Sequence, residues 1–300
     1  MDTLVSLHRK IDGATDLKAV VKTMKAVAAS NIGQYENAIR SLGDYNRTVG
    51  LGIVAYFKAI KLNQKSEQKV TVSNNETLIG AVVFGSDQGL VGRFNDSITK
   101  FAVEALHDIP GKKEIWAVGE RVQSLLEDTG FTISKLFSVP NSVNAITPLV
   151  GQVLINAEQS HEKDNMKEFY IFHNQPNTEA TYVPVMQRLL PLDTKWRHYF
   201  DDLKWPTNKI PQIAGGLQST LRAIIREYLF ASLFRACAES LDSENASRLA
   251  AMQRAEKNIG DMLDGLNKTY HRLRQDSIDE ELFDVVSGFE ALKYDKINQN

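Results

Sequence analysis

The chain has 300 residues, of which 43% are hydrophobic and 24% charged; this composition excludes a wholly disordered protein and allows one large domain or two smaller ones. The 35 basic and 37 acidic side chains leave a formal net charge of -2, which argues against binding to nucleic acid through a basic surface. The single cysteine, Cys237, excludes an internal disulfide and a metal site built on several thiolates. No secretory signal and no stretch long and apolar enough to span a bilayer are recognisable, so we expect a soluble cytoplasmic protein.

Residues 1–60 predict one long helix. Apolar residues from Val21 to Ile60 recur about every 3.5 positions, the period of a coiled coil, with Asn46 as a polar member of the row. Proline would interrupt such a helix, but all eight prolines lie between Pro110 and Pro211. A break or kink is most expected at residues 12–15. The polar residues 61–76 that follow are expected to form a linker.

Residues 77–208 predict a globular α/β domain. Short apolar runs rich in β-branched and aromatic residues alternate with amphipathic stretches, which is typical of an open α/β sheet. Strands are expected at 78–84, 114–118, 131–137, 168–173 and 182–190, and helices at 96–107, 120–128 and 143–158.

Residues 209–300 predict a second long helix, because the 3.5-residue spacing returns from Ile213 to Leu273. A continuous helix from Ile213 to Leu292 would measure roughly 120 Å, too long for the interior of a protein of this size. It should therefore project from the body and pair with the N-terminal helix in antiparallel orientation. The alternative is two or three shorter helices with turns near 242–245 or 260–265.

The candidate sites for chemistry are weak. Gly85, Gly89 and Gly92 follow a strand, where phosphate loops occur, but their spacing matches no nucleotide-binding motif, so a structural turn is favoured. The six histidines show no metal-ligand spacing. Cys237 is expected to be a small core residue rather than a nucleophile, and the acidic run 276–284 to be a solvated helix face.

A basic cluster near the N-terminus is the other candidate binding feature. Membrane headgroups, nucleic acid or an acidic protein surface could receive it, and a solvated face is the plain alternative. The cluster comprises His8, Arg9, Lys10, Lys18, Lys22 and Lys25.

Three stretches carry a family resemblance that covers the whole chain. The runs VVKTMKAVAAS (Val20–Ser30) and Ala246–Leu292 resemble the signature ends of the gamma subunit of F-type ATP synthases, and GSDQGLVGRFN (Gly85–Asn95) is similar to that family's Asp-x-Gly-Leu-Cys-Gly turn. The resemblance implies an antiparallel coiled coil of the terminal helices and a Rossmann-like α/β domain. It implies a central rotor stalk that transmits torque and has no catalytic, cofactor-binding or metal residues.

The same resemblance implies the partners. They are the alpha and beta subunits of a catalytic hexamer, the epsilon subunit and the membrane c-ring, with no nucleic acid. The protein would lie peripherally at the cytoplasmic face of a bacterial inner membrane.

Individual residues are matched to the family in the same way. Met24 and Lys25 correspond to a methionine and a lysine near the catch region of beta, and Arg274 and Gln275 to an Arg-Gln pair that meets the beta catch loop. An arginine suits this role because its planar fork binds loop carboxylates in a geometry that lysine lacks. The apolar tip in the hexamer sleeve corresponds to Phe289, Ala291 and Leu292.

Several positions depart from the family pattern. Val91 replaces the turn cysteine, Arg93-Phe94 a pair of small residues and Asn31 a usual lysine, while Tyr270–Arg274 reads YHRLR in place of YNRAR, and Lys293–Asn300 extends past the usual end. These departures resemble a divergent branch, the alternate ATPases found beside a standard enzyme in some bacteria and associated with sodium.

Two rival functions remain from the residues alone. A nucleotide-binding enzyme with helical extensions would need a phosphate loop. A coiled-coil scaffold or chaperone with an α/β domain would expose an apolar tip without needing the C-terminal motif.

Overall fold

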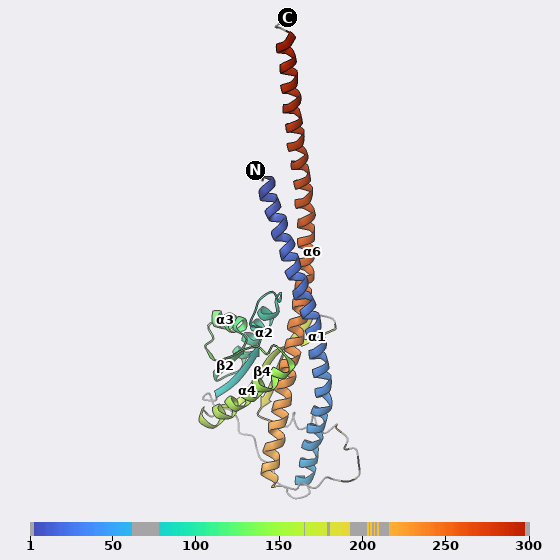
Figure 1. Ribbon diagram of the computed structural model, residues 1–300. Coiled ribbons are helices and arrows are strands. Elements are labelled where there is room, and N and C mark those ends of the chain that lie inside the picture. Colours follow the sequence, from blue (N-terminus) through green and yellow to red (C-terminus); the bar gives the residue numbers. More distant parts are fainter. Residues whose placement is uncertain are drawn as a thin grey trace. The chain divides into compact units, whose positions relative to one another are not determined.

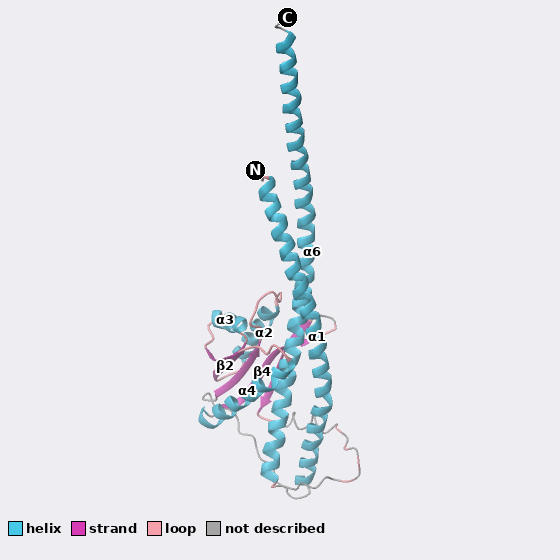
Figure 2. Cartoon of the chain, viewed as in Figure 1, coloured by secondary structure: helices cyan, strands magenta, loops and turns pink. Residues whose placement is uncertain are grey.

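The computed structural model describes residues 3–61, 78–164, 166–178, 181–192, 203, 205, 207, 209 and 216–297 (Figure 1). The chain divides into two compact units, Met1–Val27 with Ala250–Asn300 and Ala28–Leu249, and we describe each by itself. The elements in chain order are α1 (Leu4–Lys61), β1 (Leu78–Phe84), α2 (Phe94–Asp108), β2 (Lys112–Val118), α3 (Glu120–Asp128), β3 (Ile133–Phe137), α4 (Val143–Asp164), β4 (Met166–Pro176), β5 (Tyr182–Leu190) and α6 (Leu217–Ile297) (Figure 2).

The long N-terminal helix is confirmed as α1, and the break expected at residues 12–15 is wrong. The Thr15 hydroxyl donates to the Ile11 carbonyl within the helix, and Ala14 is buried between two exposed neighbours. The buried row therefore starts before Val21 and repeats every seven residues, as Leu7, Ala14, Val21, Ala28 and Tyr35. This period is that of a left-handed coiled coil.

The C-terminal helix is confirmed as one continuous helix, α6, of 81 residues. The alternative of turns near 242–245 or 260–265 is wrong. In each unit α6 lies antiparallel to α1, because the partner number on α6 falls as the number on α1 rises. The contacts are His8 with Tyr270 and Lys25 with Glu256 in the first unit, and Asn31 with Asn245 and Tyr45 with Glu227 in the second.

The second unit contains the predicted α/β sheet, with strand order β3-β2-β1-β4-β5. All five expected strands and all three expected helices are present; the largest difference is in α4, which ends six residues later than predicted. β1 pairs in parallel with β2 and β4, and β2 with β3, whereas β5 runs antiparallel to β4 at the edge. This reversal of β5 was not predicted from the sequence.

Helices cover both faces of the sheet. One face packs on α2 and α3 through a core that includes Ile98, Leu106, Val122 and Leu126. The other face packs on α4 and also on the two long helices, through Tyr35 of α1 and five residues of α6 between Leu233 and Leu241. The middle of α6 is therefore part of the core of the α/β domain.

The expected linker, residues 61–76, lies outside the described residues except for Lys61, the last residue of α1. Within the described ranges, no helix is both long and apolar enough to cross a lipid bilayer.

Candidate functional site

The first unit places Lys25 in a contact with α6. Its ammonium group lies 2.5 Å from the Glu256 carboxylate, and this hydrogen bond lowers the pKa of Glu256. The positive charges of Lys22 and Lys18 lower the same pKa further. Part of the basic cluster therefore faces a carboxylate of the chain itself. Met24, beside Lys25, is half-buried.

Arg274 and Gln275 are exposed on α6. Arg274 lies 18 residues after Glu256, the partner of Lys25, which corresponds to roughly 27 Å along the helix. The structure therefore does not bring Met24 and Lys25 together with Arg274 and Gln275. The two pairs lie at different heights of the coil.

The last part of α6 continues beyond the start of α1 as a single helix (Figure 1). Apolar side chains on this part are exposed, among them Phe283 at 72% and Val285 at 70%. Phe289, Ala291 and Leu292 belong to α6 by their backbone, and their side chains lie outside the described ones. Exposed apolar residues also precede this tip, and they were not predicted although they stand out in the sequence as apolar residues among carboxylates: Ile278, Leu282, Phe283, Val285 and Val286.

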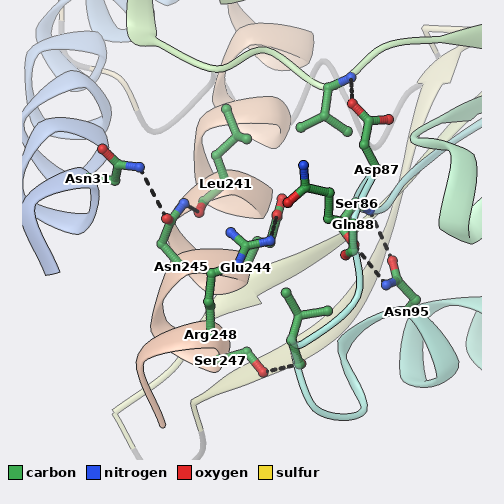
Figure 3. A network of polar contacts seen from close by, with 12 residues as sticks. Asn31, Ser86, Asp87, Gln88, Asn95, Leu241, Glu244, Asn245, Ser247 and Arg248 are labelled. Atoms are coloured by element: carbon green, nitrogen blue, oxygen red, sulfur yellow. Dashed lines mark hydrogen bonds and ion pairs between the residues drawn. The ribbon is translucent and has the colours of Figure 1, made fainter. Parts of the chain in front are cut away.

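The glycine-rich turn after β1 is held by its own chain. The amide of Gly85 donates to the Val118 carbonyl, and the amide of Ser86 donates to the Asn95 side chain (Figure 3). Gly119, at φ +113°, approaches so closely that an added Cβ would lie 2.7 Å from the Ser86 carbonyl carbon. These amides therefore bind protein atoms, as the structural-turn reading expected.

Asp87 ties three loops together at the carboxyl edge of the parallel strands. One carboxylate oxygen accepts the amide of Glu120, at the start of α3, and the other accepts the amide of Val139, after β3. A carboxylate at a helix N-terminus is also favoured by the helix dipole. These bonds fix the start of the turn to the loops at the edge of the sheet, and Val91, later in the turn, contacts α6.

A ten-residue stretch of α6, residues 236–245, is buried at every position. Ten residues make almost three helical turns, so every face of the helix is covered there. Six of these ten residues are polar or charged, which is unusual for a buried helix, because an unpaired buried polar group destabilises the fold. Glu239 and Ser243 have partners on β4, Asn245 has one on α1, and Glu244 is bound by Arg248 of α6 itself.

Three of the polar residues in and next to this stretch form what we call the polar stripe, Glu239, Ser243 and Ser247. Their spacing of four places them on one face of α6. Glu239 binds His173 of β4 at 2.8 Å, the Ser243 hydroxyl donates to the Asn174 carbonyl of β4, and the Ser247 hydroxyl donates to the Val91 carbonyl of the turn.

Charge supports the Glu239 contact. Burial disfavours the charged form of Glu239, but hydrogen bonds from His173 and Arg235 outweigh it and lower the pKa of this carboxyl. Arg235 donates from one turn earlier on the same helix at 2.7 Å. An ionised Glu239 therefore stays bonded to β4 at neutral pH.

Other faces of the buried stretch meet the turn and α1. Burial raises the pKa of Glu244, assisted by the charge of Asp87 and opposed by Arg248, which binds Glu244 at 2.6 Å (Figure 3). Asn31 of α1 donates to the Asn245 side chain at 3.3 Å. Burial, together with the charge of Glu244, raises the pKa of Tyr35 of α1 to about 12.

Cys237 is buried inside this stretch, and burial raises the pKa of its thiol. A protonated buried thiol is a poor nucleophile, which agrees with the predicted core role. Among the described residues, no group of three or more His, Cys, Asp and Glu side chains is arranged to hold a metal ion.

Comparison with known proteins identifies the family. A family model described as ATP synthase matches residues 3–292. The ATP synthase gamma chain of Hydrogenobaculum sp. is 27% identical over 290 residues, covering 95% of this chain and 97% of the relative; that of Sulfurihydrogenibium sp. is 24% identical over 298 residues, covering 96% and 97%.

Solved structures share the fold. The rotor of the Euglena gracilis mitochondrial ATP synthase, 17% identical, covers 92% of this chain and 98% of its own with a TM-score of 0.62. The central stalk and c-ring structure of the Tetrahymena thermophila mitochondrial enzyme contains a chain that is 21% identical, with coverages of 79% and 99% and a TM-score of 0.56. With a family model matched over nearly its full length and gamma chains as relatives, this chain belongs to the ATP synthase gamma-chain family.

Proposed function

We propose that this chain is the central-stalk rotor of an ATP synthase and carries torque between a membrane c-ring and a catalytic hexamer of alpha and beta subunits. The observation that carries the proposal is α6, a continuous helix that pairs with α1 in antiparallel orientation and then continues alone. Two paired helices resist bending and twisting better than one. The paired helices are therefore suited to transmitting torque.

An asymmetric shaft can impose order on identical catalytic sites. A rotor that contacts one beta subunit differently from the next shifts the open–closed equilibrium of that subunit, whereas equal contacts would shift nothing. The single-helix end of α6 exposes apolar side chains and carboxylates over residues 278–288, and a lone helix has no threefold symmetry of its own.

In this proposal the chain performs no chemistry. ATP is bound and hydrolysed by alpha and beta, and the gamma chain, together with epsilon, links them to the c-ring. The assembly would hold the chain peripherally at the cytoplasmic face of a bacterial inner membrane, in keeping with bacterial relatives such as those of Hydrogenobaculum and Sulfurihydrogenibium. The sodium-type branch stays a prediction.

The proposed contacts with the hexamer lie at separate heights. Arg274 and Gln275 are the exposed candidates for the beta catch loop, and Met24 and Lys25 lie lower on the coil, where Lys25 already binds Glu256. Phe289, Ala291 and Leu292 remain the proposed tip in the hexamer sleeve.

The test of the function is reconstitution. The full chain is combined with the alpha and beta subunits of its own organism, and a bead on the α/β domain reports rotation when ATP is added. We expect stepwise rotation in one direction. A chain that fails to enter the hexamer, and instead holds unfolded client proteins, would support the rival chaperone function.

The Arg274 contact gives a residue-level prediction. We expect Arg274→Ala to lose about 1.5–3 kcal/mol of contact with a loop carboxylate. Stall torque should fall while the circular dichroism of the subunit stays unchanged. Arg274→Lys should restore only part of the torque, because lysine lacks the fork geometry.

Arg272→Ala is the matched control, since Arg272 is also exposed but lies two residues away, on another side of α6. Equal torque in the Arg274→Ala and Arg272→Ala variants would remove Arg274 from the contact.

A further inference from the structure

The described residues of the second unit hold α6 in two chemically different ways. Apolar side chains such as Leu233 and Leu241 pack on the sheet face, and apolar packing is non-directional. The polar stripe adds directional hydrogen bonds from α6 to the sheet and its turn. A helix held only by apolar packing can turn slightly about its own axis with little change in free energy. A helix that is also held by hydrogen bonds loses those bonds as it turns.

From this arrangement we propose that the polar stripe, Glu239, Ser243 and Ser247, prevents α6 from rotating about its own axis relative to the α/β domain. Torque applied to the helix then reaches the domain, and torque applied to the domain reaches the helix, without elastic lag. The inference rests on the proposed rotor function and assigns one step of that function to named positioning residues.

The arrangement of the partners supports this role. Three of the four partner groups belong to consecutive residues of β4, an interior strand of the sheet: His173 and Gln175, which bind Glu239, and Asn174, which binds Ser243. The fourth is the Val91 carbonyl in the glycine-rich turn. The Asn174 side chain in turn donates to the Phe94 carbonyl, so β4 and the end of that turn are bonded to each other.

The turn itself is well anchored. Asn95 and Ser86 bond each other twice, and Asp87 binds the amides of Glu120 and Val139. A force on Val91 is therefore passed to α3 and to the loop after β3. Hydrogen bonds can restrain α6 only if the groups that bind it are themselves held rigidly, and the bonds of Ser86, Asp87 and Asn95 hold the turn in this way.

The position of the stripe also fits. Its last two members lie in and just after the stretch that is buried on every side, and Ser243 is fully buried. In a water-free setting a hydrogen bond resists displacement more strongly, because no water can replace the lost partner. The stripe thus lies where α6 is most completely enclosed.

The experiment measures the torsional stiffness of the rotor in the assembled complex. The alpha/beta hexamer is fixed to a surface, the shaft is arrested with a non-hydrolysed nucleotide, and a bead on the α/β domain reports angular fluctuation. In the double variant Ser243→Ala/Ser247→Ala we expect the angular variance to rise by roughly twofold, since two of the four hydrogen bonds from the polar stripe to β4 and the turn are removed. ATP hydrolysis without load should stay at the wild-type rate.

The control is Ser240→Ala/Ser219→Ala, which makes the same chemical change on α6 outside the stripe. Ser240 is buried one position after Glu239, and Ser219 is exposed and bonds the Gly216 carbonyl. We expect wild-type variance from the control. Should the double variant not assemble, Ser247→Ala alone is measured, and an intermediate variance is expected.

Two results would overturn the inference: wild-type variance in the Ser247→Ala and double variants, or an equal rise in the control. A wild-type complex that does not rotate at all would instead contradict the proposed function, so the two failures are distinguishable.

Discussion

Individual carboxylates in the middle of α6 have pKa values that differ from their ordinary values. Asp242 is buried, and burial, followed by the charges of Glu36 and Glu239, raises its pKa from 3.8 to about 6. Glu239, three residues earlier, has a lowered pKa because His173 and Arg235 bind it. Neighbouring carboxylates thus respond in opposite directions, and the difference follows from the presence of a basic partner.

Asp242 gives a pH-dependent prediction. Its folded-state pKa lies above the ordinary value, so the charged form opposes folding, fully above about pH 6, and the effect disappears below about pH 3, where the group is protonated in both states. Asp242→Asn should therefore raise the free energy of unfolding by about 3 kcal/mol at pH 8 and leave it unchanged near pH 3. Urea unfolding at the two pH values measures this.

The control for Asp242 is Asp261→Asn, a substitution at an exposed carboxylate of the same helix. A pH-independent gain in both variants would mean that the charge of Asp242 is not responsible.

Gly119 gives a steric prediction. Its φ of +113° and the 2.7 Å approach of an added Cβ to the Ser86 backbone both exclude a side chain. Gly119→Ala should destabilise the α/β domain by about 2–4 kcal/mol in thermal or urea unfolding. Gly89→Ala is the comparison, because no atom lies within 4 Å of its added Cβ, and its effect should stay within about 0.5 kcal/mol.

At the scale of elements, the two long helices change character along their length. In the first unit α1 meets α6 through a narrow buried row, Leu7, Ala14 and Val21, while Leu17 and Val20 remain exposed. In the second unit α6 is covered on every side over residues 236–245. The same helix is therefore one strand of a coiled coil in one unit and a core element in the other.

The narrow row predicts a local weakness near the start of α1. Leu7 is 1% exposed, and Leu7→Ala should remove about 2–4 kcal/mol from the pairing of the helix ends. Hydrogen exchange of the amides at 4–21 should accelerate, whereas those of β1 and β4 should not change. Val5→Ala, at a position 64% exposed, should leave all of these rates unchanged; similar acceleration by both variants would refute the heptad register.

At the scale of the whole molecule, the single-helix end of α6 is exposed. Its described side chains are not buried against either unit. We expect a chain truncated after Ser277 to keep the unfolding midpoint of the α/β domain, and its rotor to deliver less torque in the hexamer. A lowered midpoint would mean that the removed residues stabilise the fold.

Most of the architecture was predictable from the sequence because it depends on periodicity. Heptad spacing identified both long helices, and alternating short runs identified the sheet. The strand reversal at β5 was not predictable, because an isolated strand such as Tyr182–Leu190 looks the same in either direction.

The contacts between α6 and the sheet were not predictable from the sequence. The polar residues of 242–245 left open the alternative of a turn, because their partners are far away in the chain. The structure shows that Ser243 donates to the Asn174 carbonyl and that Asn31 donates to the Asn245 side chain. The contact of Lys25 with Glu256 was likewise hidden, because it depends on the register of two helices more than 200 residues apart.

The contribution of α6 to the sheet core also determines when the protein can finish folding. β1, β2, β3 and α4 are synthesised by residue 164 and β4 and β5 by residue 190, but part of their apolar face is completed by residues 233–241. While the ribosome translates the intervening stretch, Trp116 and Phe169 belong to a surface that still lacks one of its covering helices. A nascent chain in this state is exposed to aggregation, so chaperones would meet this protein in the interval before its last third emerges.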